Sequence, residues 1–293
     1  MEEIIQALAF LMFFLVLAFA TEWVYRKTVA RVQKRYGPLH TGFAGILQPL
    51  ADFLKLMTKE DLGVPEESVY FKLAPILLVF IPLMALYVLP LAGAGLSFDG
   101  DIIFLLILFN AYVGIVWLFS SSLDSRFANV GAMRQSTQFF SFEVPFILSL
   151  AAFAIHGGSL SLSGLKGFDW LLVPSFLVFM VASLGKLRKL PFDAPTAGQE
   201  IATGIEVELS GRKLALFRLG ENLEFVFVAG LGAVLLFGPP ASILLFIVEF
   251  VPIVILFSIV SALFPRYRID QVSDFFWRYM TALALCGVIL SYF

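Results

Sequence analysis

Long, unbroken apolar runs alternate with polar segments along most of the chain. They lie near 4–25, 71–94, 101–121, 130–155, 169–186, 215–237, 241–264 and 274–292. About 20 apolar residues in a helix cross the hydrocarbon core of a bilayer, where a helix satisfies its own backbone hydrogen bonds. The runs lack the two-residue alternation of barrel strands. We therefore predict an all-α, polytopic membrane protein of about eight transmembrane helices, forming a single integral domain over residues 1–293.

Composition supports membrane insertion and excludes several functions. The chain is 60% hydrophobic and 14% charged, whereas soluble domains are about 45–50% apolar and about 25% charged. A net charge of −2 gives no reason to expect nucleic acid as a partner. One cysteine and two distant histidines, His40 and His156, predict no metal site and no cofactor held by this chain alone.

Basic residues are distributed unevenly between the two sides of the predicted bundle. With eight spans, all but one of the 20 Lys and Arg residues fall in or beside the linkers of one side, and Lys166 is the exception. The positive-inside rule places that side in the cytoplasm. We therefore expect a multi-pass protein of the cell membrane, with cytoplasmic loops at 26–70 and 187–214 and both termini on the outer side.

The first of these loops contains a second kind of helix. From Gln48 onward, apolar residues recur at steps of three and four, which is typical of an amphipathic helix, and Pro49 suits its first turn. We expect this helix to lie in the membrane surface or against a partner. A plain surface anchor is the alternative interpretation.

Several glutamates fall inside the predicted spans. Glu143 lies near mid-depth of its span, Glu221 and Glu224 share one helix face, and Glu249 lies deep in the seventh span. Charges inside a bilayer are costly and usually functional or paired. Such carboxylates suit a proton or cation path, and the alternative is a set of neutral or ion-paired groups that hold helices together. We find no P-loop, GxSxG or Gly-rich dinucleotide motif, and expect no bond-breaking chemistry in this chain.

Four blocks of residues resemble respiratory complex I subunit 1, a family that includes the membrane anchors of energy-converting hydrogenases. They are Arg26-Lys27, Gln33, Arg35–Pro38, Gly45–Asp52, Lys55 and Lys59-Glu60; Ser141–Glu143; Pro191–Pro195, Glu200, Gly204, Glu208, Ser210-Gly211 and Glu221; and Phe264–Arg268, Asp270-Gln271 and Trp277-Arg278. These blocks follow one another in order and cover nearly the whole chain.

The resemblance implies a subunit that docks a soluble redox arm and links electron transfer to H⁺ or Na⁺ translocation. Glu143, Glu200, Glu208 and Glu221 would then belong to an ion-coupling path, to which Glu224 and Glu249 are added from their places in the spans. The residues expected to face the redox arm are Arg26, Gln33, Arg35, Gln48, Asp52, Lys55, Asp193, Arg266 and Asp270. The implied partners are hydrogenase-like large and small subunits, an iron–sulfur subunit that carries the clusters, antiporter-like membrane subunits and the lipid bilayer.

Departures from the family pattern favour one branch. Quinone-reducing members usually carry an acidic residue just before the Pro-Phe-Asp block, where this chain reads Lys186–Lys189. Thr196 and Gly198 replace two further glutamates, and Tyr25 replaces another acidic residue. We therefore expect a ferredoxin-linked complex, either an energy-converting hydrogenase or a relative that reduces sulfur species. A quinone-reducing complex I subunit is the alternative within the family.

Two other classes of function remain open. A stand-alone secondary ion transporter could also carry mid-membrane carboxylates, although it predicts internal repeats that we do not find. A structural anchor that has lost ion conduction would keep the fold and the docking loops. Purification with iron–sulfur proteins favours a complex, and transport by the isolated chain favours a transporter.

Overall fold

The structure, a computed structural model, is a bundle of helices. It describes residues 2–61, 69–91, 96–123 and 125–293, without the side chains of residues 2–7. Within these residues, seven helical segments are long and apolar enough to cross a membrane, and α6 is a shorter apolar helix. The long helices are α1 (Glu2–Val32), α3 (Val69–Val88), α4 (Asp101–Ser121), α5 (Arg126–Gly157), α8 (Gly211–Phe237) and α9 (Ile243–Leu263), with α6 at Val173–Lys186. The last long segment comprises α10 (Ile269–Phe275), a π-helical turn (Phe276–Met280) and α11 (Thr281–Leu290). The prediction of an all-α polytopic membrane protein is confirmed.

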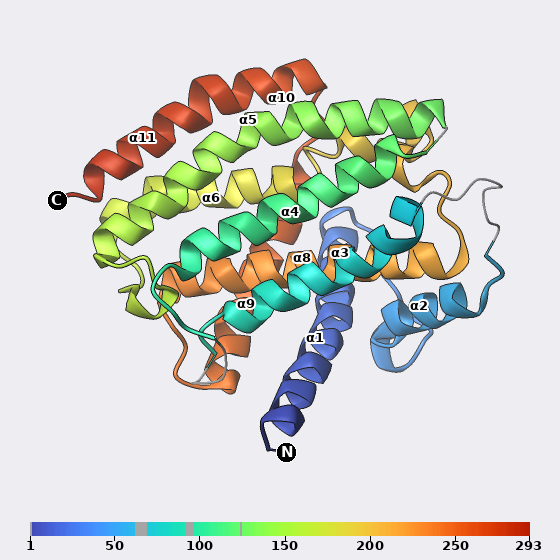
Figure 1. The fold of residues 1–293 in the computed structure, drawn as a ribbon, viewed down its shortest axis with the longest axis horizontal. Coiled ribbons are helices and arrows are strands. Elements are labelled where there is room, and N and C mark those ends of the chain that lie inside the picture. Colours follow the sequence, from blue (N-terminus) through green and yellow to red (C-terminus); the bar gives the residue numbers. More distant parts are fainter. Residues whose placement is uncertain (1, 62–68, 92–95, 124) are drawn as a thin grey trace.

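Helix α8 forms the centre of the bundle. Most of its side chains are buried, and it packs against α1, α3, α6 and α9. Gly220 permits its close approach to α3, because a Cβ there would lie 2.6 Å from the backbone oxygen of Leu78. On the other side, α5 packs against α4, α6 and α11. Figure 1 shows α1 crossing α3 and α4 steeply, with α10 and α11 along one edge.

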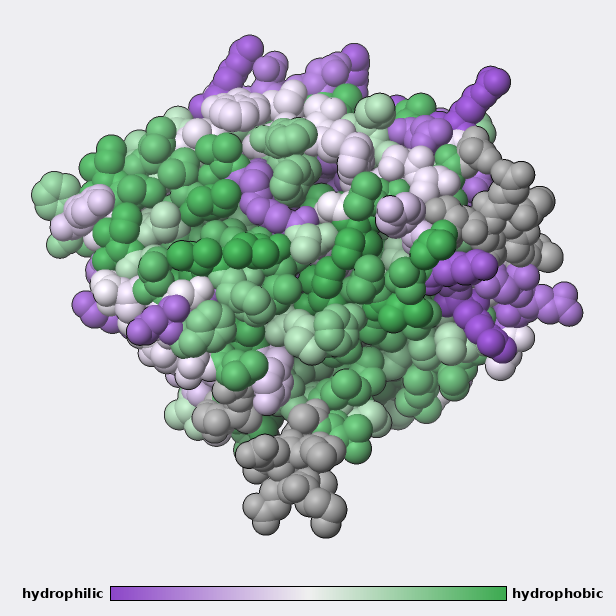
Figure 2. Space-filling model, in the orientation of Figure 1, coloured by the Kyte–Doolittle hydropathy of each residue, from purple (hydrophilic) through white to green (hydrophobic). Residues whose placement is uncertain are grey.

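The outer surface matches a bilayer. Figure 2 shows a broad hydrophobic region across one face, with hydrophilic residues gathered mainly at its upper edge and at the right, beside α2. Exposed apolar side chains include Leu73, Ile76 and Phe80 of α3 and Ile107 of α4. Apolar side chains that face outward along whole helices are expected where the solvent is lipid.

Short helices build the loops. The predicted amphipathic helix is α2 (Gln48–Thr58), which begins with Pro49 in its first turn and packs against α1 and α8. The connection from α6 to α8 contains a 3₁₀ turn (Ala194–Thr196), the short helix α7 (Gly198–Ile201) and a second 3₁₀ turn (Gly204–Glu206). Helix α1 continues to Val32, so Arg26 and Arg31, which the sequence places in the first loop, lie on its last turns.

Candidate functional site

Five charged side chains from three parts of the chain meet inside the bundle. Lys186, at the end of α6, lies 3.6 Å from Glu143 of α5, measured from Nζ to Oε2. Arg188 follows two residues later, and its Nη2 lies 2.9 Å from Glu221 and 3.8 Å from Glu224, both on α8. We call Glu143, Lys186, Glu224, Arg188 and Glu221 the buried charge chain. It joins α5 to α8 through the end of α6.

These charges are largely withdrawn from solvent. The side chains of Lys186 and Arg188 are 0% and 2% exposed, and that of Glu224 is 4% exposed. Both carboxylate oxygens of Glu143 and of Glu224 are buried without a hydrogen-bond donor among the described residues. Ion pairs in a low-dielectric interior interact strongly, and partly satisfied carboxylates retain the capacity to bind a proton. The buried charge chain therefore has the groups that proton movement requires.

One carboxylate connects the buried charge chain to the loop between α6 and α8. Glu206, in the second 3₁₀ turn, accepts a hydrogen bond from Arg218 of α8 at 3.2 Å. Burial raises the pKa of Glu206 above its ordinary value of 4.5, the negative charge of Glu221 raises it further, and Arg218 lowers it. The electrostatic interaction with Glu221 makes Glu206 sensitive to charge in the buried chain.

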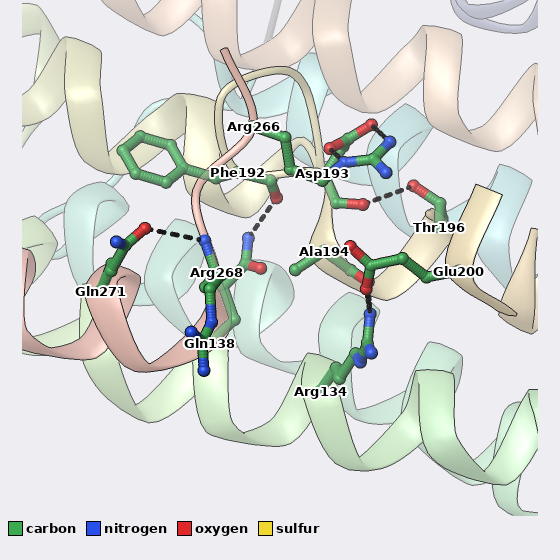
Figure 3. A network of polar contacts seen from close by, with 10 residues as sticks. All are labelled: Arg134, Gln138, Phe192, Asp193, Ala194, Thr196, Glu200, Arg266, Arg268 and Gln271. Carbon is green, nitrogen blue, oxygen red and sulfur yellow. Dashed lines mark hydrogen bonds and ion pairs between the residues drawn. The ribbon is translucent and has the colours of Figure 1, made fainter. Parts of the chain in front are cut away.

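The loop after α6 is fastened to the start of the C-terminal segment. Asp193 accepts two hydrogen bonds from Arg266, at 2.5 and 2.6 Å, and Figure 3 shows the two planar groups facing each other. Hydrogen bonding to Asp193 raises the pKa of the Arg266 guanidinium. A second link joins the backbones, since Tyr267 N donates to the Pro191 carbonyl at 3.0 Å. Bidentate Arg–carboxylate pairs of this kind fix orientation as well as distance.

Helix α5 contacts the same loop at two points. The Gln138 side-chain amide donates to the carbonyls of Gly185 and Phe192, each at 2.7 Å. Four residues earlier, Arg134 forms an ion pair with Glu200 at 2.5 Å (Figure 3). The Gln138 contacts bracket the segment that carries Lys186 and Arg188. This segment is therefore fixed to α5 at both ends.

A second polar group lies where α1, α2 and α8 meet. Arg26 forms ion pairs with Glu22 at 2.5 Å and with Asp52 at 2.8 Å. Gln48 donates to Asp52 at 2.8 Å, and Asn222 of α8 donates to Glu22 at 2.6 Å. The adjoining cavity, lined by several of these residues, has a volume of about 30 Å³, which is enough for one or two water molecules.

The remaining residues predicted to face a redox arm lie on the surface. Gln33 and Arg35 are exposed and hydrogen-bonded to each other at 2.8 Å. Lys55 is exposed on α2, and Asp270 is exposed and paired with Arg268 at 3.0 Å. These side chains are accessible to a docking protein.

The six predicted path residues do not form one group. Glu143, Glu221 and Glu224 belong to the buried charge chain. Glu200 is half exposed in its pair with Arg134. Glu208 is partly buried in the loop, and Glu249 is partly buried on α9. One carboxylate oxygen of each of these two residues is buried without a hydrogen-bond donor among the described residues.

Sequence reasoning did not identify the two cations of the buried charge chain. Lys186 and Arg188 were counted among the basic residues of the loop, because they adjoin Lys189 and the polar segment that follows. Their side chains instead turn into the bundle. The signal in the sequence is misleading here, because Arg134 and Arg218 lie in the same predicted spans as the glutamates of the buried charge chain and are the nearer candidate partners along the sequence.

The charged interior and the apolar exterior define an integral membrane protein with a polar core. The NADH dehydrogenase family model matches residues 5–292, and the chain belongs to this family, that of complex I subunit 1. It is 33% identical over 286 residues to an NADH-quinone oxidoreductase subunit of Dehalococcoides mccartyi (strain ATCC BAA-2266 / KCTC 15142 / 195), covering 92% of this chain and 80% of that protein. It is 32% identical over 305 residues to the corresponding NADH-quinone oxidoreductase subunit of Rhizobium meliloti (strain 1021), covering 94% and 92%.

A solved structure has the same fold. A chain of the membrane-bound sulfane sulfur reductase, an archaeal respiratory membrane complex, superposes with a TM-score of 0.89 at 24% identity, covering 99% of this chain and 100% of that one. The described residues include no group of three or more His, Cys, Asp or Glu side chains that could hold a metal ion. The polar groups that this part of the chain brings together are ion pairs and protonatable side chains.

Proposed function

We propose that this chain is the membrane-anchor and coupling subunit of a multi-subunit redox complex that translocates ions. The observation that carries this proposal is the buried charge chain, which connects α5 to α8 beside the loop that Asp193 and Arg266 hold. A change of charge or loop position at the surface would act on Glu221 and Arg188 first. One pKa unit corresponds to about 1.4 kcal/mol, so a modest change of field is enough to move a proton.

The proposed orientation follows from the basic loops. We place the loops at 26–70 and 187–214 in the cytoplasm and both termini on the outer side, because basic residues are retained on the cytoplasmic side. The soluble arm then docks on exposed groups around α2 and the α10 end of the bundle. Gln33, Arg35, Lys55 and Asp270 are the first candidates for contact.

Two features favour a ferredoxin-linked complex, hydrogenase-like or sulfur-reducing. The residues Tyr25, Thr196 and Gly198 depart from the quinone-reducing pattern. The structural similarity to a sulfane sulfur reductase chain agrees with this departure. In this proposal iron–sulfur clusters reside in partner subunits, and antiporter-like membrane subunits continue the ion path.

A quinone-reducing complex is the second candidate, because the curated relatives are named as subunits of NADH-quinone oxidoreductases. Purification of the chain from its native membrane in mild detergent separates the candidates. A hydrogenase-like large subunit among the co-purified proteins supports the first. Bound quinone and quinone reductase activity support the second. Transport by the isolated chain in liposomes would instead support a stand-alone transporter and contradict both.

The coupling role is tested by Glu143→Gln in the intact complex. We expect electron transfer to an artificial acceptor to continue near the wild-type rate, while ion uptake into inverted membrane vesicles falls. The reason is that Gln keeps the shape of the side chain but cannot bind or release a proton. Asp274→Asn is the matched control, since Asp274 is an exposed carboxylate paired with Arg278 at the i+4 position.

Unchanged ion uptake per electron in Glu143→Gln would remove Glu143 from the path. If neutralising Glu221 and Glu224 also left uptake unchanged, the chain would be a structural anchor. A loss of both electron transfer and uptake would show that Glu143 supports assembly, which the amounts of co-purified subunits would reveal.

A further inference from the structure

Lys186 has surroundings unlike those of a structural lysine. Its ammonium lies 3.6 Å from the Glu143 carboxylate and 3.5 Å from Oδ1 of Asn110 on α4. Both distances lie at or beyond the long end of normal hydrogen bonds. The side chain has no exposed surface, so bulk water does not solvate the charge.

Aromatic rings take the place of that water. The ammonium lies 3.5 Å from the ring centroid of Phe109 and 4.5 Å from that of Phe146, with Phe142 at 6.0 Å. Ring faces attract a cation through their quadrupole, but they neither accept nor donate protons. They therefore hold the amine in place while leaving its protons available to Glu143.

A second carboxylate acts on the same ammonium from α8. Glu224 lies 3.8 Å from Arg188, which follows Lys186 by two residues, so its negative charge favours the ammonium form of Lys186 from the α8 side. Its carboxylate oxygens are buried without a hydrogen-bond donor among the described residues. Arg188 cannot give up its proton in a protein. Of the two cations in the buried charge chain, Lys186 alone can change its protonation state.

We propose that Lys186 exchanges a proton with Glu143, an inference that rests on the coupling function proposed above. The Lys186 ammonium, 3.6 Å away, gives a proton to the Glu143 carboxylate, which leaves a neutral amine and a carboxylic acid. Glu143 then passes this proton on and returns to a carboxylate. A proton that arrives from the α8 side, where Glu224 is protonated before the step and a carboxylate after it, restores the ammonium.

The proposal also assigns the ion. A neutral amine beside Glu143 is restored by a proton and not by a metal cation. The path through this subunit therefore carries H⁺, whichever ion the partner subunits move.

The test compares Lys186→Arg with Lys186→Met in the complete complex. Arginine keeps the positive charge beside Glu143 but cannot release a proton, whereas Met fills the apolar site without charge. We expect both variants to keep electron transfer to an artificial acceptor and to lose proton uptake by inverted vesicles, followed with a pH-sensitive dye. Lys189→Met is the matched control. Lys189 lies three residues later, its Nζ is 4.8 Å from the ring centroid of Tyr25, and it does not belong to the buried charge chain.

Proton uptake at the wild-type level in Lys186→Arg would overturn the proposal, because a fixed charge would then be sufficient. If that variant does not assemble, Lys186→Met decides, and uptake retained there also overturns it. A different result would refute the coupling function itself, namely wild-type proton uptake in Glu143→Gln. Loss of uptake in Glu143→Gln together with normal uptake in Lys186→Arg would refute the lysine step and leave the coupling function standing.

Discussion

Arg188 offers a direct test of the buried charge chain as a structural unit. Arg188→Gln would leave the carboxylates of Glu221 and Glu224 without the guanidinium that lies 2.9 and 3.8 Å from them. Removing one partner of a buried ion pair costs about 3–5 kcal/mol. At about 2–4 °C per kcal/mol, the range for domains of 150–250 residues, the melting temperature should fall by at most about 6–20 °C in this chain of 293 residues.

The measurement is the fraction of detergent-purified protein that elutes as a single species after brief heating. Arg188→Gln combined with Glu221→Gln should recover part of the loss, because one uncompensated carboxylate is gone. Arg268→Gln is the matched control. Its guanidinium is exposed and paired with Asp270, so its removal should cost at most about 1 kcal/mol.

A melting temperature unchanged in Arg188→Gln would refute the reasoning, since it would mean that the carboxylates need no cation. The same holds if the double variant is less stable than the single one. In that case Glu221 would stabilise the fold by contacts other than its ion pair with Arg188.

Three further predictions concern other parts of the molecule. Gly220→Ala should lower the melting temperature measured in the same way, because the added methyl group overpacks the contact between α8 and α3 at a cost of about 1–3 kcal/mol. Gly114→Ala is the control and should not lower it, since the space around its Cβ position is open. Asp193→Asn should weaken a charged hydrogen-bonded pair with Arg266 worth about 1.5–3 kcal/mol, and should speed limited proteolysis of the loop after α6 without changing cleavage elsewhere. Burial raises the pKa of Glu206, so the folded state holds its proton to higher pH than the unfolded chain. Stability should therefore fall as pH rises from 4.5 through the raised pKa. A melting-temperature series across pH should show this decline in the wild type and a flatter profile in Glu206→Gln.

The sequence was informative where the physics is local. The apolar runs predicted the helices because a bilayer imposes their length, and the three- and four-residue steps after Gln48 predicted α2. Intramembrane glutamates were visible because charge is rare in such runs. The sequence did not show whether these glutamates point into the bundle or outward, since Glu143 and Glu249 have similar sequence surroundings. Only the packing of the helices places Lys186 beside Glu143.

Contacts between distant residues were beyond sequence reasoning. Arg134 and Glu200 are 66 residues apart, and the resemblance placed Glu200 in the coupling path with no indication of its surface partner. Lys186 and Arg188 were grouped with the loop because a span end and a loop start share the same composition. Their burial depends on where the segment after α6 turns, and the Gln138 contacts fix that turn.

The double contact of Gln138 gives the bundle a mechanical property. One amide on α5 binds the carbonyls at both ends of the segment from Gly185 to Phe192. That segment cannot slide along α5 without breaking one of these hydrogen bonds. A displacement of the loop at Asp193 should therefore move α5 as well as the segment. Glu143 lies five residues further along the same helix, and its distance from Lys186 is set by the same fastening. We therefore expect a displacement of the loop at Asp193 to move α5 and to change the distance between Glu143 and Lys186.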